Sequence, residues 1–181
     1  MRPAETDTEV RASAKEGLGL FARRTFTPIE FIHRVRFERE ITKDSPLRTE
    51  LGERFDHCAY PDGKVMLVAH PYRHLNHSCD PNAYYQYEGE IPIARARRFI
   101  AAGDEITVDY LINNPGGDRW PCRCGAARCR GQTGTSFFDL PRSFQEEYAP
   151  LLPSWFCKRF ADRLHKLGLV QDGNRTTTGA A

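Results

Sequence analysis

No run of apolar residues in this sequence is long enough for a membrane-spanning helix, which needs about 20 such residues. The polar N-terminus, residues 1–9, lacks the basic start and apolar stretch of a secretory signal. A strong charge of either sign is also missing, because 26 Lys and Arg against 24 Asp and Glu leave a formal net charge of +2. We therefore expect a soluble intracellular protein, cytoplasmic or, in a eukaryotic host, nuclear, with no membrane partner and nucleic acid disfavoured as a direct ligand.

Internal repeats are absent as well, and 181 residues suffice for one domain with a sizeable core. Turn-forming residues interrupt the apolar stretches every few positions, which predicts many short strands. Two segments, 64–68 and 105–110, are rich in β-forming residues at strand length. The polar ends, residues 1–7 and 172–181, are expected to be disordered.

Helical periodicity is scarce before residue 140. One weaker candidate spans 45–56, where apolar residues recur at four-residue spacing. After residue 140, Pro141 and Pro153 each open a helical stretch, and Gly168 ends the second. Four apolar residues of that second stretch share one face, which predicts packing against a core: Phe156, Phe160, Leu164 and Leu167.

The cysteines are few and unevenly placed. Three of the six form a C-x-C-x4-C cluster, Cys122, Cys124 and Cys129, and no C-x-x-C redox motif is present. A tetrahedral zinc site needs a fourth ligand, for which Cys79 in the turn-rich stretch 76–82 is the best candidate. Nearby arginines would offset the thiolate charge. A disulfide-stapled secreted domain is the alternative, but nothing at the N-terminus supports export.

Four elements occur in a fixed order: Gly-Leu-Gly-Leu-Phe-Ala at 17–22, Arg-His-Leu-Asn-His-Ser-Cys-Asp-Pro-Asn at 73–82, Gly-Asp-Glu-Ile-Thr-Val-Asp-Tyr at 103–110, and the cysteine cluster. Together they resemble the motif set of SET-domain lysine methyltransferases with a post-SET zinc motif, over residues 8–131. The resemblance implies a mostly β fold of small sheets, with a knot-like core between 76–82 and the segment before Tyr110, plus C-terminal helices. It divides the chain into a SET domain at 8–115, a post-SET zinc motif at 116–132 and a helical extension at 133–171.

The resemblance also implies a role for individual residues. Catalytic roles are expected for Tyr110 and Tyr85. Strand alternation points only one of the neighbours Tyr84 and Tyr85 inward, and matching to the family pattern favours Tyr85. S-adenosylmethionine is expected to bind at seven positions: Gly17, Leu18, Gly19, Arg73, Asn76, His77 and Tyr110. Zinc is expected at Cys79, Cys122, Cys124 and Cys129, in agreement with the spacing. The family position two residues before the catalytic tyrosine is usually aromatic but is Val108 here, which leaves the number of methyl groups open.

The implied activity is N-methylation of an accessible lysine on a protein substrate. The methyl donor already carries an activated methyl group, so the protein mainly positions and desolvates the donor and the lysine amine. No nucleophilic side chain of the protein is required. Two alternatives remain. A non-catalytic SET-like interaction module would keep the fold and the zinc, and a zinc-stabilised nucleic-acid binder would need a stronger basic character than this sequence has.

Overall fold

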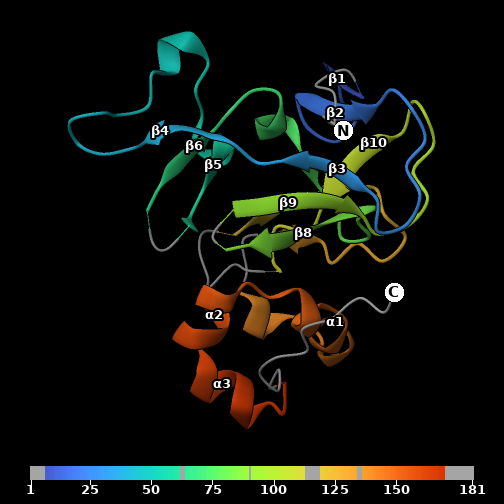
Figure 1. Ribbon diagram of the computed structural model, residues 1–181, viewed down its shortest axis with the longest axis vertical. Helices are drawn as coiled ribbons and strands as arrows, with labels where there is room; N and C mark the ends of the chain where they lie inside the picture. The colour runs from blue at the N-terminus through green and yellow to red at the C-terminus, as the bar shows by residue number, and fades with distance from the viewer. Residues whose placement is uncertain (1–6, 62–63, 90, 113–118, 134–135, 170–181) are drawn as a thin grey trace, which may run out of the picture.

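The computed structural model describes residues 7–61, 64–89, 91–112, 119–133 and 136–169. Short strands form several small sheets, and helices gather at the C-terminal end of the chain (Figure 1). The prediction of a mostly β fold with C-terminal helices is confirmed. In these ranges no helix is both long and apolar enough to cross a membrane, since the longest α-helix has seven residues.

The largest sheet has four strands in the order β1-β2-β10-β7. Its strands are β1 (Thr8–Ala12), β2 (Leu18–Ala22), β10 (Glu105–Val108) and β7 (Asn76–His77). The predicted strand at 105–110 is therefore confirmed over its first four residues. Leu20 of β2 and Ile106 of β10 face each other in register and are fully buried, so this sheet presents one face to the core.

The second sheet has the order β3-β9-β8 and consists of β3 (Phe31–Arg34), β9 (Ile91–Ala96) and β8 (Ala83–Glu88). Strands β8 and β9 pair along their whole length, from Ala83 opposite Ala96 to Glu88 opposite Ile91. Buried residues of this sheet and of the first sheet belong to one apolar cluster, which makes the two sheets the main core of the protein.

The third sheet has the order β4-β6-β5 and consists of β4 (Phe37–Glu40), β6 (Met66–Val68) and β5 (Cys58–Ala59). It extends to one side of the other two sheets (Figure 1). Strand β6 confirms the prediction at 64–68 over its last three residues.

The helix predicted at 45–56 is wrong. Two 3₁₀ turns, η1 (Thr49–Leu51) and η2 (Phe55–His57), occupy the segment instead. Gly52 has a φ of 76° and ends the first turn. Leu51 and Phe55 are 68% and 63% exposed, so the apolar spacing has no core to pack against. The Glu53 carboxylate accepts the backbone N–H of Arg48 at 2.7 Å, which holds the segment in a turn.

Between the sheets and the end of the chain lie the short pair β11 (Trp120–Pro121) and β12 (Gln132–Thr133), then η5 (Phe137–Asp139). Four more elements follow: α1 (Arg142–Tyr148), η6 (Ala149–Leu151), α2 (Ser154–Arg159) and α3 (Ala161–Lys166). These α-helices lie together below the β8–β9 sheet in Figure 1.

The helical predictions after residue 140 are confirmed, with one difference. Phe160, at φ −114° and ψ 23°, interrupts the second stretch and separates α2 from α3. The predicted stripe is a packing face: Phe156 and Leu164 are buried in a second apolar cluster, and Phe160 and Leu167 pack against it. Gly168, at φ 63°, follows α3 as expected.

Of the ends predicted to be disordered, residues 1–6 and 172–181 lie outside the described residues. Asp7 is described, and its carbonyl accepts the backbone N–H of Arg23 at 2.8 Å. This contact continues the pairing of β1 with β2.

Candidate active site and metal centre

A parallel strand pair joins two segments that are distant in sequence. Asn76 lies opposite Thr107 and His77 opposite Val108, so β7 runs beside the end of β10. The Asn82 side chain continues the contact: its Nδ2 donates to the Glu105 carbonyl at 2.9 Å, and its Oδ1 accepts the Thr107 N–H at 2.8 Å. The stretch 76–82 therefore flanks the strand that leads to Tyr110, as the family resemblance implied.

Asn76 also connects β7 with the loop that leads into β2 and contains Gly17 and Gly19, residues 13–19, here named the glycine loop. Its Nδ2 donates to the carbonyls of Glu16 and Leu18 at 3.1 and 3.0 Å and to Glu105 Oε1 at 2.8 Å. Both hydrogens on Asn76 Nδ2 are therefore donated to acceptors within the protein. Within the described ranges no donor reaches the Asn76 amide oxygen, which leaves it as the group that can accept a hydrogen bond from a ligand.

The two glycines of the loop have different structural roles. Gly17 has a φ of 45°, and no atom lies within 4 Å of the position that a Cβ would occupy. Gly19 abuts β10, because a Cβ there would lie 2.4 Å from Glu105 Oε1. Gly17 therefore leaves open space at the loop, and Gly19 permits close packing against Glu105.

Glu105 is a residue that sequence reasoning missed. Its carboxylate accepts the Ser13 hydroxyl at 2.8 Å as well as the Asn76 amide, and Lys15 Nζ lies 3.8 Å from its other oxygen. Lys15 Nζ also donates to the Cys124 carbonyl at 3.2 Å. The glycine loop is thereby held to β10 on one side and to the cysteine cluster on the other. No local pattern marks Glu105 for this role, because its partners Ser13 and Asn76 lie 92 and 29 positions away in the sequence.

Tyr110 follows β10 and is anchored at both its backbone and its hydroxyl. Its N–H donates to His77 Nδ1 at 3.2 Å, and its hydroxyl donates to the Leu75 carbonyl at 2.6 Å. Burial raises the pKa of Tyr110 well above its ordinary value, and the negative charges of Asp56, Glu105 and Glu16 act in the same direction. The phenol is therefore neutral at physiological pH.

Tyr85 is the tyrosine of β8 that shares the environment of Tyr110. Both pack against the main apolar cluster, and Tyr84 is not among the residues that do. Burial raises the pKa of Tyr85 far above its ordinary value, with Tyr110 the next contributor. The structure thus brings Tyr85 and Tyr110 together. Arg73, in the 3₁₀ turn η4 (Tyr72–His74), has its guanidinium in an ion pair with Glu38 of β4.

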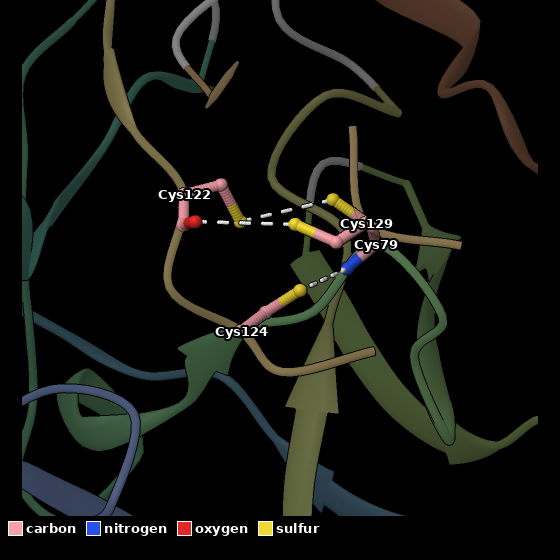
Figure 2. Close-up of side chains that lie close together, drawn as sticks. All are labelled: Cys79, Cys122, Cys124 and Cys129. Atoms are coloured by element: carbon pink, nitrogen blue, oxygen red, sulfur yellow. Dashed lines mark hydrogen bonds between the residues drawn. The ribbon is translucent and has the colours of Figure 1, made fainter. Parts of the chain in front are cut away.

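The four predicted metal ligands meet at one point. The sulfur atoms of Cys79, Cys122, Cys124 and Cys129 all lie within 4.8 Å of one another and point inward (Figure 2). The sulfurs of Cys79 and Cys122 are 3.8 Å apart, which matches the ~3.8 Å edge of a thiolate tetrahedron with Zn–S bonds of about 2.3 Å. All four are free thiols, so the structure supports a metal site and not a disulfide framework.

Backbone N–H groups face these sulfurs and suit thiolates. Cys124 Sγ accepts the N–H of Cys79, and Cys79 Sγ accepts that of Arg130, each at 3.4 Å. The pairing of β11 with β12 closes the base of the loop that carries the other three cysteines. The cluster is therefore a preformed set of four soft ligands that could hold a metal ion.

His77 lies between the metal centre and Tyr110. Its Nε2 is 3.3 Å from Cys79 Sγ, and its Nδ1 accepts the Tyr110 N–H. Burial lowers the pKa of His77 to about 4, against the opposing effect of Asp109, so its ring is neutral. A neutral ring is what allows Nδ1 to act as an acceptor.

Comparison with known proteins gives a consistent result. Residues 17–111 match the family model described as the SET domain. The chain is 26% identical over 178 residues to a histone-lysine N-methyltransferase, H3 lysine-36 specific, of Kluyveromyces lactis, covering 90% of this chain and 23% of that protein. It is 32% identical over 132 residues to histone-lysine N-methyltransferase Set2 of Drosophila melanogaster, covering 66% of this chain and 6% of that protein.

A solved structure from Plasmodium falciparum, described as a candidate histone methyltransferase, is 22% identical. It aligns with a TM-score of 0.46 and covers 59% of this chain and 95% of that one. The chain spans about a quarter or less of the length of the curated relatives named above.

Proposed function

The chain belongs to the SET-domain family, and on this premise we propose that it transfers a methyl group from S-adenosylmethionine to a lysine side chain of a protein substrate. One observation carries the proposal. The adjacent residues Leu75 and Asn76 contact Tyr110 and the glycine loop, because the Leu75 carbonyl accepts the Tyr110 hydroxyl and Asn76 Nδ2 donates to the Leu18 carbonyl. The proposed cofactor cradle and a half-buried tyrosine therefore meet at two consecutive residues.

The residues around the glycine loop fit S-adenosylmethionine. The open space at Gly17 allows a ligand to approach the backbone, and the Asn76 amide oxygen suits an ammonium donor. We propose Gly17, Leu18, Gly19, Asn76 and His77 as the residues that hold the cofactor. Arg73 has a weaker claim, because its guanidinium is engaged by Glu38. When bound, S-adenosylmethionine supplies a methyl group already activated on a sulfonium.

Tyr110 is proposed to orient the attacking amine. Its proton is directed to the Leu75 carbonyl, which leaves the lone pairs of the phenol oxygen to accept an N–H of the lysine. Because the pKa of Tyr110 is raised, it is not a general base at neutral pH. Its contribution is geometric: it fixes the direction of the nitrogen lone pair for an in-line transfer.

The lysine must lose a proton before it can attack, since its ordinary pKa is ~10.4. Burial near Tyr110 and Tyr85 disfavours an ammonium, because a charged amine there would lose its hydration. We propose that the proton leaves to solvent as the side chain enters and that Tyr85 forms the second wall of the lysine channel.

We further propose zinc as the metal of the four-cysteine site. Four thiolates in a closed tetrahedral set are typical of structural zinc. The Lys15 contact to Cys124 would then attach the zinc loop to the cofactor loop. The division into a SET domain at 8–115, a zinc motif at 116–132 and a helical extension at 133–171 is part of this proposal.

The test is methylation by the purified, zinc-loaded protein with isotopically labelled S-adenosylmethionine, offered a cell lysate or core histones and read by mass spectrometry. We expect lysine methylation that falls at least a hundredfold in Tyr110→Phe. Tyr84→Phe is the matched control, because Tyr84 lies on the same strand as Tyr85 but outside the cluster around Tyr110. Bound cofactor without any methylation would favour the non-catalytic interaction module.

A further inference from the structure

We propose that Arg130 is a positioning residue that couples the metal centre to Tyr110 through a buried ion pair with Asp109. The proposal rests on the proposed methyl transfer, because it assigns a role within that reaction. Arg130, one of the arginines near the cysteine cluster, lies between that cluster and the candidate active site.

The first step is the position of Tyr110. Strand β10 ends at Val108, so no strand ladder holds the backbone of Tyr110. Four contacts hold this segment: the Tyr110 N–H to His77, the Tyr110 hydroxyl to Leu75, the Leu111 N–H to Asp109 Oδ1 at 3.0 Å, and the longer backbone bond from the Ile112 N–H to the Asp109 carbonyl at 3.4 Å. The Asp109 side chain thus closes a turn across Tyr110 and fixes the direction in which the chain leaves the strand.

The second step is the charge of Asp109. Its side chain has no solvent exposure, so its carboxylate requires a partner. Arg130 supplies two parallel bonds, Nη1 to Oδ2 at 2.7 Å and Nη2 to Oδ1 at 2.8 Å. His77 Nδ1 lies 3.6 Å from Asp109 Oδ1 but accepts the Tyr110 N–H, so among the described residues Arg130 is the cation hydrogen-bonded to this carboxylate. A bidentate arginine fixes both the charge and the orientation of the carboxylate.

The third step is the dependence of Arg130 on the metal loop. Arg130 directly follows the metal-ligand candidate Cys129, and its own N–H donates to Cys79 Sγ at 3.4 Å. Its guanidinium also lies 5.1 Å from the centre of the Phe144 ring of α1. The place of Arg130 is therefore set where the four sulfurs meet, and its side chain extends from there to the residue before Tyr110.

The consequence is a coupling between the metal loop and the turn that carries Tyr110. If the metal loop is displaced, Arg130 withdraws and leaves Asp109 buried without a countercharge. The turn over Tyr110 then loses its anchor. The glycine loop loses the Lys15 contact to Cys124 when the metal loop moves, but it keeps its contacts to Glu105 and Asn76, and loss of Arg130 alone leaves all three in place. Loss of Arg130 should for that reason reduce turnover more than cofactor affinity.

The experiment compares Arg130→Met, Arg130→Lys and Asp109→Asn in the zinc-loaded, full-length protein. Zinc content, S-adenosylmethionine affinity by calorimetry, kcat, and amide hydrogen exchange at 109–111 are measured for each. We expect Arg130→Met to lower kcat at least tenfold and to speed exchange of the Leu111 amide at least tenfold, with zinc content and cofactor Kd within twofold. Arg130→Lys should restore part of the kcat. Asp109→Asn, which lies outside the metal loop, should match Arg130→Met, and the double variant should be no worse than either alone.

The matched control is Arg128→Met. Arg128 is in the same loop and stacks on the same Phe144 ring at 4.0 Å, but its partner is Glu147. Equal loss of kcat in Arg128→Met would show that loop integrity alone explains the effect and would overturn the proposal, as would unchanged Leu111 exchange in Arg130→Met. A wild type that never methylates would refute the proposed function, and the exchange data would still decide whether Arg130 positions the turn.

Discussion

The two glycines at 17 and 19 are expected to tolerate alanine very differently. At Gly17 an alanine meets no neighbouring atom, so the cost is the left-handed backbone alone, about 1 kcal/mol. At Gly19 the new Cβ would lie 2.4 Å from Glu105 Oε1 and 3.1 Å from Phe21 Cε2. A carboxylate at the end of a flexible side chain could normally move aside, but here Ser13 and Asn76 hold that oxygen at 2.8 Å each.

The magnitude follows from those two bonds. To reach an ordinary contact the oxygen must retreat by about 1 Å, which breaks both hydrogen bonds. Hydrogen bonds to charged groups contribute about 1.5–3 kcal/mol each, and partial exposure of the Glu105 side chain favours the lower figure. Gly19→Ala should therefore destabilise the fold by about 3 kcal/mol, roughly three times the effect of Gly17→Ala.

Urea unfolding of the metal-loaded protein measures both effects, with Glu105→Ala as a second background. Because Glu105→Ala removes the atom that clashes, the cost of Gly19→Ala there should fall below about 1 kcal/mol. The reasoning is refuted if Gly19→Ala costs no more than Gly17→Ala, or if its cost is the same in the Glu105→Ala background.

Three other changes have outcomes that follow from the structure. Cys79→Ser should leave less than one zinc per chain by metal analysis and lower the melting temperature, whereas Cys157→Ser, outside the cluster, should keep the metal. Burial lowers the pKa of His33 to about 3, so only the unfolded state takes up its proton as the pH falls below 6.5. His33 should therefore cost about 2 kcal/mol of stability between pH 6.5 and 5. Burial also lowers the pKa of His74 and His77, so both variants should lose stability over this range, but in urea unfolding the loss should be about 2 kcal/mol smaller in His33→Phe than in the wild type. Phe156→Ala should cost about 3–5 kcal/mol in the same assay, because the ring is fully buried, and Phe99→Ala, at 60% exposure, should cost far less; equal losses would contradict the assigned core.

Features set by local pattern were predictable from the sequence. The cysteine spacing indicated three metal ligands and a turn-rich stretch indicated the fourth, and all four sulfurs meet. The apolar stripe from Phe156 to Leu167 predicted a packing face because helical periodicity repeats within a few residues. At 45–56 the same kind of periodicity failed, since spacing alone does not show whether a core is present to receive the apolar face.

The motif positions were also fixed by the sequence, because residue types in a given order are visible without coordinates. What only the tertiary structure decided was the set of polar contacts between those motifs. Glu105 bonded to Ser13 across 92 positions, Lys15 to Cys124 across 109, and Arg130 to Asp109 across 21 leave no trace in local spacing. Such pairs depend on the path of the chain through the four small sheets of the described residues, and that path exists only when their strands are paired.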